Sequence, residues 1–182
     1  DAVGDDFPVS VKLNSADFQR GGFSYEDAVA VAIMLDQAGV DLLEISGGNY
    51  ENPVLIMGLG GDANRTMARE AYFLRYAKDI KNAINIPLMV TGGFRTAEAM
   101  AAALKNGECD MIGVARPLCG APKCVDDLLQ GNIQRLPSWE QDLTLPWPLE
   151  KLSEIVPLVR LGKQALTVQP WCYVQILRMG EG

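Results

Sequence analysis

The sequence predicts an α/β protein built from four parallel βα units, and three observations support this. Short apolar runs end in glycines or in a basic turn, as in PLMVTGG at 87–93 and MIGVARP at 111–117. These runs are continuously apolar rather than alternating, which is typical of strands in a covered parallel sheet. Strands and helical segments also alternate at similar length along residues 7–131. Arrays of this kind close as eight-stranded barrels or lie open as doubly wound sheets.

The first βα unit opens the chain. The run FPVSVKL at 7–13 reads as a strand, with Lys12 near its C-terminal end. Ser24 precedes a periodic apolar segment, and Asp27 follows it three residues later, which is an acidic variant of the capping box. Gly39 supplies the stop signal that commonly ends a helix. A strand, a loop and a helix are therefore expected in this order.

The second unit contains a long connection. Its strand is DLLEIS at 41–46, and residues 49–65 after it are rich in glycine and asparagine. A loop of this length in a compact array is usually a lid or disordered, and the functional interpretation is a lid over the site. The glycines at 58–61 lack the preceding strand and the spacing of a dinucleotide fingerprint. The helix expected over 67–83 carries an apolar stripe at Phe73, Ala77, Ile80 and Ile84.

Residues 87–118 contain the third and fourth units. The apolar run at 88–90 reads as a strand, and Thr96 is expected to cap the helix after it, which closes at Gly107. A second apolar run follows at 111–115. A helix that joins two parallel strands makes a right-handed crossover, so both strands end at the same edge of the sheet.

That edge carries the main functional signal of the sequence. Gly92 and Gly93 follow one strand, and Arg116 follows the other. Glycine amides, a nearby helix N-terminus and a fixed cation together form a cradle for a phosphate group. Barrels commonly bind phosphate with the loops after their last two strands, so this position favours a barrel over an open sheet. The alternative interpretation is a tight turn beside a surface arginine.

Two domains are expected. Residues 1–131 form the βα array, which closes with a short helix at 124–130. Residues 132–182 form a proline-rich, irregular and helical extension packed on the array, with helices expected at 149–163 and 170–180. The candidate binding groups all lie in the first domain.

The composition excludes several classes of function. A net charge of −7 argues against a nucleic-acid partner, because such partners need clustered Lys and Arg. No apolar run approaches the ~20 residues of a membrane span, so no membrane partner is expected. Histidine is absent, which excludes Ser-His-Asp and Cys-His nucleophile pairs and imidazole zinc sites.

The four cysteines lie at 109, 119, 124 and 172. Their spacing is not the paired C-x-x-C of a zinc site, and a chain with this much apolar sequence does not need a disulfide framework. We therefore expect reduced thiols in a cytoplasmic protein and no metal.

Five segments stand out in order along the chain: VKLN at 11–14, EISGGNYENP at 44–53, REAYFLRYA at 69–77, VTGGFRT at 90–96 and DMIGVARPL at 110–118. Together they resemble the old yellow enzyme family of flavin-dependent oxidoreductases, the NADH:flavin oxidoreductases. The match covers about residues 7–131, and the closing YVQILRMGEG resembles the family's C-terminal helix. The resemblance implies an eight-stranded barrel that holds FMN at its strand ends. It also implies the reduction of activated alkenes, such as α,β-unsaturated carbonyls, with electrons from NAD(P)H.

The resemblance assigns five cofactor-binding residues. Lys12 matches the basic residue beside flavin N1 and O2, where a cation stabilises the negative charge of reduced flavin. Gly92 and Gly93 match the turn that donates amides to the FMN phosphate. Ala115 and Arg116 match the next strand's turn, in which the arginine binds that phosphate.

The resemblance also implies that half of the barrel is missing. The matching strands correspond to the family's fifth to eighth, so the fold is half of a TIM (βα)8 barrel, which as a whole takes ~250 residues. In the family the absent half binds the substrate carbonyl and supplies the tyrosine proton donor, so no catalytic residue is expected here. The outer strand edges, at 9–13 and 111–115, are expected to pair with the N-terminal half or with a second chain.

The leading functional hypothesis is the C-terminal part of an FMN-dependent ene-reductase that needs its missing half for activity. A second hypothesis is a half-barrel assembly module without catalytic activity. A third is a barrel lyase that uses Lys12 as a Schiff-base nucleophile.

Overall fold

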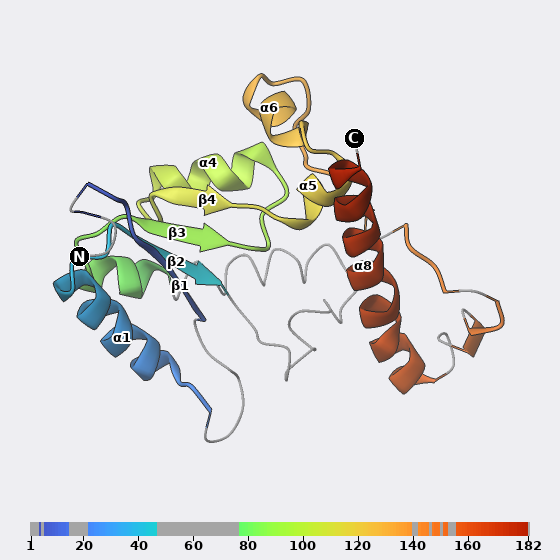
Figure 1. The fold of residues 1–182 in the computed structure, drawn as a ribbon, viewed down its shortest axis with the longest axis horizontal. Coiled ribbons are helices and arrows are strands. Elements are labelled where there is room, and N and C mark those ends of the chain that lie inside the picture. The colour runs from blue at the N-terminus through green and yellow to red at the C-terminus, as the bar shows by residue number, and fades with distance from the viewer. Residues whose placement is uncertain are drawn as a thin grey trace. The chain divides into compact units, whose positions relative to one another are not determined.

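The computed structural model describes most of the chain (Figure 1). It covers residues 4, 6–14, 22–46, 77–139, 142–145, 147–149, 151–152 and 156–181, with the backbone alone over 157–166. The chain divides into two compact units, one with the sheet up to Gly113 and one with residues 95–98 and the chain from Val114 onward. The predicted boundary between residues 131 and 132 separates a domain with the cofactor site from an extension. This division by function stays a prediction.

Four parallel strands form one sheet in the order β1-β2-β3-β4. The strands are β1 (Ser10–Asn14), β2 (Leu42–Ser46), β3 (Leu88–Thr91) and β4 (Met111–Gly113). Each strand pairs with the next strand along the chain, so every connection is a crossover between neighbours. The described part of the chain places no strand against the outer edge of β1 or of β4.

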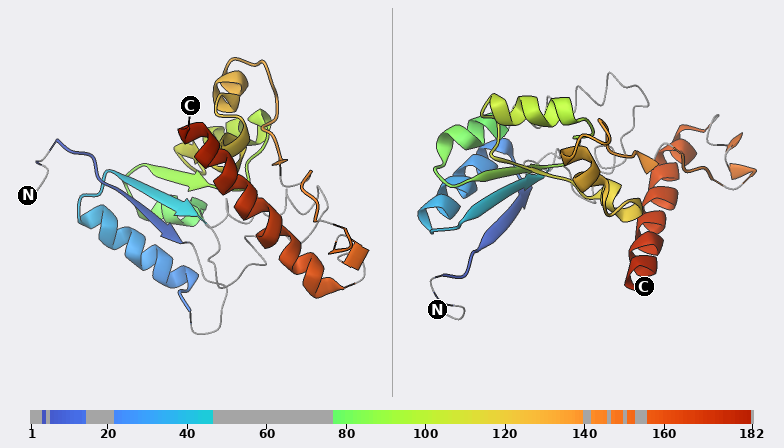
Figure 2. Two further views of the ribbon diagram at one scale, coloured as in Figure 1. Left: turned by 45° about the vertical axis from the view of Figure 1, so that its right-hand side comes forward. Right: turned by 90° about the horizontal axis from the view of Figure 1, so that it is seen from above.

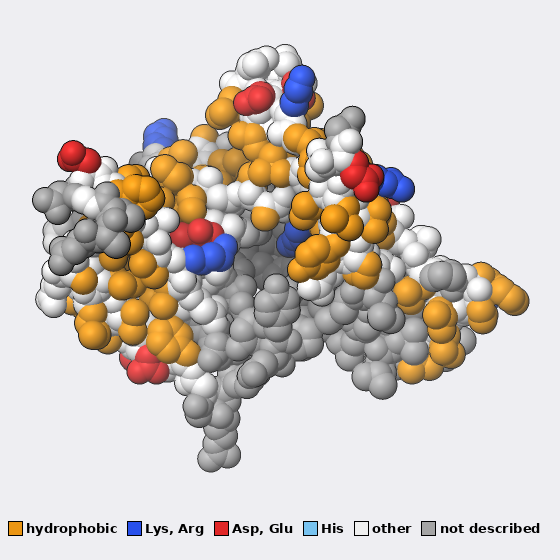
Figure 3. All heavy atoms as spheres, viewed as in Figure 1, with side chains coloured by type: hydrophobic (Ala, Val, Ile, Leu, Met, Phe, Trp, Pro, Cys, Tyr) orange, Lys and Arg blue, Asp and Glu red, His pale blue; other side chains and the backbone are white. Residues whose placement is uncertain are grey.

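Helices connect and follow the strands. They are α1 (Tyr25–Gln37), a helical segment at 77–83, α4 (Ala97–Lys105), α5 (Arg116–Gly120), α6 (Cys124–Leu129) and α8 (Pro157–Gly180). The last turns of α8 expose apolar side chains, and Figure 3 shows hydrophobic groups over this part of the helix. None of the helices, over the residues described, is both long and apolar enough to cross a membrane.

The core of the first unit lies on one face of the sheet. Leu43 and Ile45 of β2 and Leu88 and Val90 of β3 point to the same side, because side chains alternate along a strand. They pack with Ile84 and with buried residues of the three crossover helices, namely Ala28, Ala32, Ala77, Ile80 and Ala103. Figure 2 shows α1 and α4 on the same side of the sheet. Doubly wound sheets carry helices on both faces, so this arrangement confirms the predicted half-barrel.

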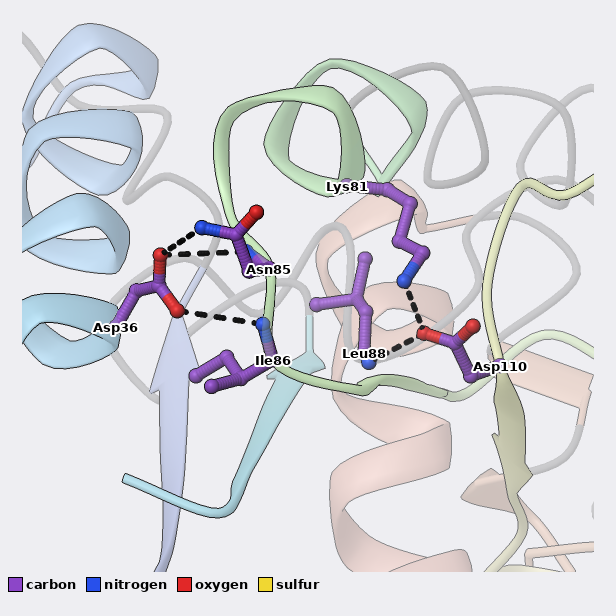
Figure 4. A network of polar contacts seen from close by, with 6 residues as sticks. All are labelled: Asp36, Lys81, Asn85, Ile86, Leu88 and Asp110. Atoms are coloured by element: carbon purple, nitrogen blue, oxygen red, sulfur yellow. Dashed lines mark hydrogen bonds and ion pairs between the residues drawn. The ribbon is translucent and has the colours of Figure 1, made fainter. Parts of the chain in front are cut away.

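Aspartates tie the N-terminal ends of the strands together. Asp36, in the last turn of α1, accepts hydrogen bonds from the backbone and side-chain nitrogens of Asn85 at 3.2 and 3.0 Å. It also accepts one from the Ile86 amide at 3.3 Å, just before β3 (Figure 4). Asp41 accepts from the Val9 amide at 2.7 Å, just before β1. Each carboxylate satisfies backbone donors that precede a strand, which aligns the strand starts.

Asp110 makes the third such tie. Its carboxylate accepts from the Leu88 amide at 2.7 Å and forms an ion pair with Lys81 at 2.6 Å (Figure 4). Burial raises the pKa of Asp110, but the hydrogen bonds from Lys81 and Leu88 and the Lys81 charge outweigh it and hold the pKa below its usual value. The start of β4 is thus tied to β3 and to the helix at 77–83.

Helix ends follow the predicted signals. Ser24 caps α1 with Asp27 in a reciprocal capping box, as expected. At the other end, the amides of Gly39 and Val40 donate to the carbonyls of Asp36 and Leu35, at 3.1 and 3.2 Å. This is a Schellman motif, and its positive φ of 80° at Gly39 suits glycine, which has no Cβ to clash. α4 and α6 end in the same way at Gly107 and Gly131.

Some predicted boundaries were wrong. β1 begins at Ser10 rather than at residue 7, because Pro8 has no amide hydrogen for the ladder. β4 ends at Gly113, and Arg116-Pro117 opens the short helix α5 instead of a turn. The predicted loop at 49–65 and the first part of the helix at 67–83, with Phe73, lie outside the described residues.

The C-terminal extension is more helical than predicted. One helix, α8, covers the second half of the helix expected at 149–163 and all of the one expected at 170–180, and it ends at Gly180. Residues 149 and 151–152 are also helical. Pro157 lies in its first turn, where the missing amide hydrogen costs nothing. Pro170 lies inside the helix, where a proline normally disfavours helical structure by roughly 3 kcal/mol, so it reads as a boundary in the sequence.

Asp110 predicts a specific pH dependence of stability. A carboxyl group whose pKa is lowered by folding stabilises the native state above its unfolded pKa, and this contribution is lost as the pH falls through the folded pKa. We expect the Asp110→Asn variant to be less stable than the parent at pH 7 and to lose less stability between about pH 5 and pH 2. Urea unfolding at a series of pH values measures both effects.

Asp79→Asn is the matched control. Asp79 is exposed on the same helical segment as Lys81 and has no hydrogen bond or ion pair within the described chain. An Asp110→Asn variant whose acid sensitivity equals that of the parent would contradict the proposed tie.

Candidate functional site

The face of the sheet opposite the core carries polar side chains in rows. Register places Lys12 of β1 beside Glu44 of β2, and Glu44 beside Met89 of β3. The next row towards the C-terminal ends consists of Asn14, Ser46, Thr91 and Gly113. In a closed barrel this face lines the interior, and active sites lie at the C-terminal ends of the strands. The polar row therefore lies where a barrel enzyme binds its ligand.

Lys12 forms an ion pair with Glu44 across the β1–β2 ladder. The Lys12 side chain is 55% exposed, whereas that of Glu44 is 17% exposed. The structure thus places the predicted cation on the ligand face, held by a carboxylate. Glu44 was not among the predicted site residues. Each of the two residues lies two positions before the end of its strand, and strands that pair in register place such residues side by side.

Gly92 and Gly93 form the turn at the end of β3. Their φ angles are 112° and 82°, values that side chains rarely adopt, so glycine is required at both positions. A Cβ on Gly92 would meet no atom of the described chain within 4 Å, which leaves open space beside this backbone. The Gly92 amide donates a long hydrogen bond, 3.4 Å, to the Gly113 carbonyl, while the Gly93 amide has no partner among the described residues. Gly93 is therefore the better placed of the two donors for an anion.

Thr91 and Gly113 fit together on the ligand face. A Cβ on Gly113 would lie 1.8 Å from Thr91 Oγ1 and 2.9 Å from Thr91 Cβ, so the threonine occupies the space that a side chain would need. The Thr91 hydroxyl is buried and has no hydrogen-bond partner in the described part of the chain. A buried hydroxyl without a partner is costly in a finished structure, which indicates that a further polar group belongs near this strand end.

Ala115 and Arg116 follow β4 by two and three residues and belong to the second unit. Ala115 precedes the first turn of α5, and Arg116 is the first residue of that helix, with a half-buried side chain. Pro117 beside it is fully buried, which fixes the start of α5. The arginine thus extends from the start of a short helix whose next residue is buried.

Among the predicted residues, Gly92 and Lys12 lie in the first unit, where the Gly92 amide is hydrogen-bonded to the carbonyl of Gly113 at the end of β4. Lys12 lies two strands away from the β3 turn, a separation of about 10 Å for neighbouring strands about 4.8 Å apart. A cation and a glycine turn this far apart suit an elongated ligand better than a small anion.

The cysteines and acidic residues do not form a metal site in the described chain. All four cysteines are free thiols. No group of three or more Cys, Asp or Glu side chains gathers among the described residues. Burial raises the pKa of the Cys109 thiol to about 11, with help from the charges of Asp110 and Glu108, so this thiol stays protonated near neutral pH.

Known proteins similar to this chain include NADH-dependent flavin oxidoreductases. An NADH-dependent flavin oxidoreductase, iccE, of Talaromyces variabilis is 40% identical over 114 residues, or 61% of this chain and 28% of the relative. An NADH oxidase of Thermoanaerobacter brockii is 31% identical over 124 residues, or 68% of this chain and 18% of the relative. The chain thus spans less than a third of the length of these two relatives. No family model matches the chain.

A solved structure supports the same relationship. A 2-naphthoyl-CoA reductase in complex with 2-naphthoyl-CoA matches with a TM-score of 0.61 and 27% sequence identity. The match covers 74% of this chain and 20% of the reductase. The resemblance to the NADH:flavin oxidoreductase family is thereby confirmed.

The fit of Thr91 to Gly113 predicts a coupled pair of substitutions. We expect Gly113→Ala to destabilise the chain by about 1–3 kcal/mol, because the new methyl group overlaps the threonine side chain. Adding Thr91→Ala should recover part of that loss, since the closest atom, Oγ1, is then gone. Urea unfolding of the two single variants and the double variant measures the coupling.

Gly107→Ala provides a contrast, because a Cβ there meets open space and the cost comes from its positive φ alone. Strictly additive effects of Gly113→Ala and Thr91→Ala would show that the two residues are not in contact.

Proposed function

We propose that this chain forms the C-terminal half of an FMN-dependent NAD(P)H oxidoreductase of the ene-reductase type. The substrates would be activated alkenes such as α,β-unsaturated carbonyls, and activity would require the missing half of the barrel. The relatives support a flavin and NADH, since their names include NADH-dependent flavin oxidoreductase and NADH oxidase. FMN and the alkene are the finer part of the proposal, as is a cytoplasmic location.

The observation that carries the proposal is the layout of the C-terminal edge. Lys12 lies on the ligand face of β1, and the Gly92-Gly93 turn lies about 10 Å away at the end of β3. An FMN molecule presents an anionic phosphate at one end and a ring that gains negative charge on reduction at the other. The Gly93 amide and Arg116 are assigned to the phosphate, and Lys12 to the ring.

Residues of this chain hold and polarise the cofactor, and the cofactor supplies the redox chemistry. FMN, when bound, would supply the hydride transfer between NAD(P)H and the alkene. The proton for the α-carbon comes from the half of the barrel that this chain does not contain. Lys12 contributes a positive charge that favours the reduced flavin, and Glu44 partly offsets this charge.

The lyase hypothesis is not favoured by the surroundings of Lys12. A Schiff-base lysine must be a neutral amine to attack a carbonyl carbon, and enzymes achieve this by desolvation or a neighbouring cation. The Lys12 side chain is instead more than half exposed, and the neighbour it contacts is the Glu44 carboxylate rather than a cation. The ion pair thus suits an electrostatic role.

The sheet edges support a requirement for a partner. Val9 beside β1 is 44% exposed and Met111 of β4 is 48% exposed, and both lie at the outer strands. Unpaired apolar strand edges are association sites. We propose that the strands of the N-terminal half of the same barrel cover them, with a second copy of this chain as the less favoured partner.

The phosphate assignment is tested by comparing FMN with riboflavin, which lacks the phosphate. On the complete barrel, Arg116→Ala should weaken FMN binding by about 10- to 150-fold, the worth of a charge-assisted hydrogen bond, and leave riboflavin binding unchanged. Calorimetric titration with both ligands measures the effect.

Arg178→Ala, in the last turn of α8, is the control for a general loss of positive charge. A complete barrel that binds neither flavin would overturn the proposed function, and an Arg116→Ala variant that loses both ligands equally would overturn the role of the arginine. A colourless half-barrel that binds its other half but no flavin would support the assembly-module hypothesis.

A further inference from the structure

The second unit contains an aromatic cluster on the helix that begins with Arg116. The Trp139 and Trp171 rings lie with centroids 5.6 Å apart and planes inclined by 36°. Trp139 Nε1 donates a hydrogen bond of 3.2 Å to the Pro117 carbonyl of α5, next to the arginine. Trp171 belongs to α8, which packs on α5.

Gly120, at the end of α5, leaves the space that the Trp139 and Trp171 rings occupy. A Cβ on this residue would lie 2.6 Å from Trp139 Cε2 and 2.8 Å from the end of the Trp171 ring. Such distances are too short for any real contact, so the tryptophan pair rests directly on the helix backbone. α5 is only five residues long and has few bonds of its own to hold it. Its orientation therefore depends on what is packed against it.

The chain that leads to Trp139 is anchored at its other end near the glycine turn. The Leu136 amide donates to the Arg95 carbonyl at 2.7 Å, and the Ala97 amide donates to the Gln134 carbonyl at 3.1 Å. Thr96 and Arg135 complete this antiparallel bridge. Residues 134–139, which we call the strap, thus join the backbone that follows Gly93 by two residues to the helix that begins with Arg116.

We propose that Trp139, seated on Gly120 and packed on Trp171, is a positioning residue for Arg116 in phosphate binding. The inference rests on the proposed function. Trp139 touches no ligand in this scheme. Its N–H bond and its ring hold α5 in the orientation that presents the guanidinium, while the strap sets α5 relative to the backbone after the glycine turn.

The test uses Trp139→Phe on the complete barrel, a change that keeps a ring but removes the N–H donor. We expect the Kd for FMN to rise about 2- to 10-fold, the worth of one neutral hydrogen bond, and the Kd for riboflavin to stay unchanged. In the Arg116→Ala background, Trp139→Phe should have no further effect on FMN binding, because it acts only through the arginine.

Gly120→Ala is the second variant, since its methyl group displaces the rings without removing them, and it should show the same preference for weakening FMN. Two controls are matched to these changes. Trp147→Phe alters a tryptophan that is 75% exposed, and Gly180→Ala adds a Cβ that meets open space on α8. Neither control should change either Kd.

The outcomes separate this inference from the proposed function. Equal weakening of FMN and riboflavin by Trp139→Phe, an unchanged FMN affinity, or full additivity with Arg116→Ala would each overturn the positioning role. The proposed function would survive any of these, provided that Arg116→Ala alone still discriminates between the two flavins. A parent barrel that binds no flavin would remove both.

Discussion

The in-register pairing of four parallel strands is the constraint on which the site depends. Because all the crossover helices pack on one face, the other face is left for a ligand, and all strand ends open at one edge. Register then decides which side chains meet there. It places Lys12 against Glu44 and Thr91 over Gly113, and it leaves the glycine turn beside the end of β4. The two members of each pair are far apart in the sequence.

The anion-binding groups assigned here depend on different kinds of support. The Gly92-Gly93 turn needs only its own backbone angles, which glycine adopts without strain. Arg116 stands on a helix too short to be stable alone, so its placement relies on the buried Pro117, on Trp139 and on α8. The C-terminal extension, whose sequence looks irregular, thus supplies the packing that the short helix α5 lacks.

Local signals in the sequence were sufficient for most of the fold. Apolar runs located the strands within a few residues, and Ser24 with Asp27 located the start of α1. The family resemblance supplied the candidate site residues, and their role in binding a cofactor stays a prediction. Three features could not be predicted. The Glu44 partner of Lys12 and the fit of Thr91 to Gly113 depend on register, and the course of α8 through Pro170 depends on packing that outweighs a local helix breaker.

The aspartate ties described at the strand starts have a consequence for how such a protein can diversify. Asp36, Asp41 and Asp110 bind the amino ends of the strands, whereas the residues assigned to the ligand lie near or beyond the carboxyl ends. The residues that stabilise the sheet and the residues assigned to the ligand thus lie at opposite ends of the same strands. Mutations in the loops around the ligand therefore leave the aspartate hydrogen bonds intact. The substrate can change during evolution while the sheet that supports the site stays the same.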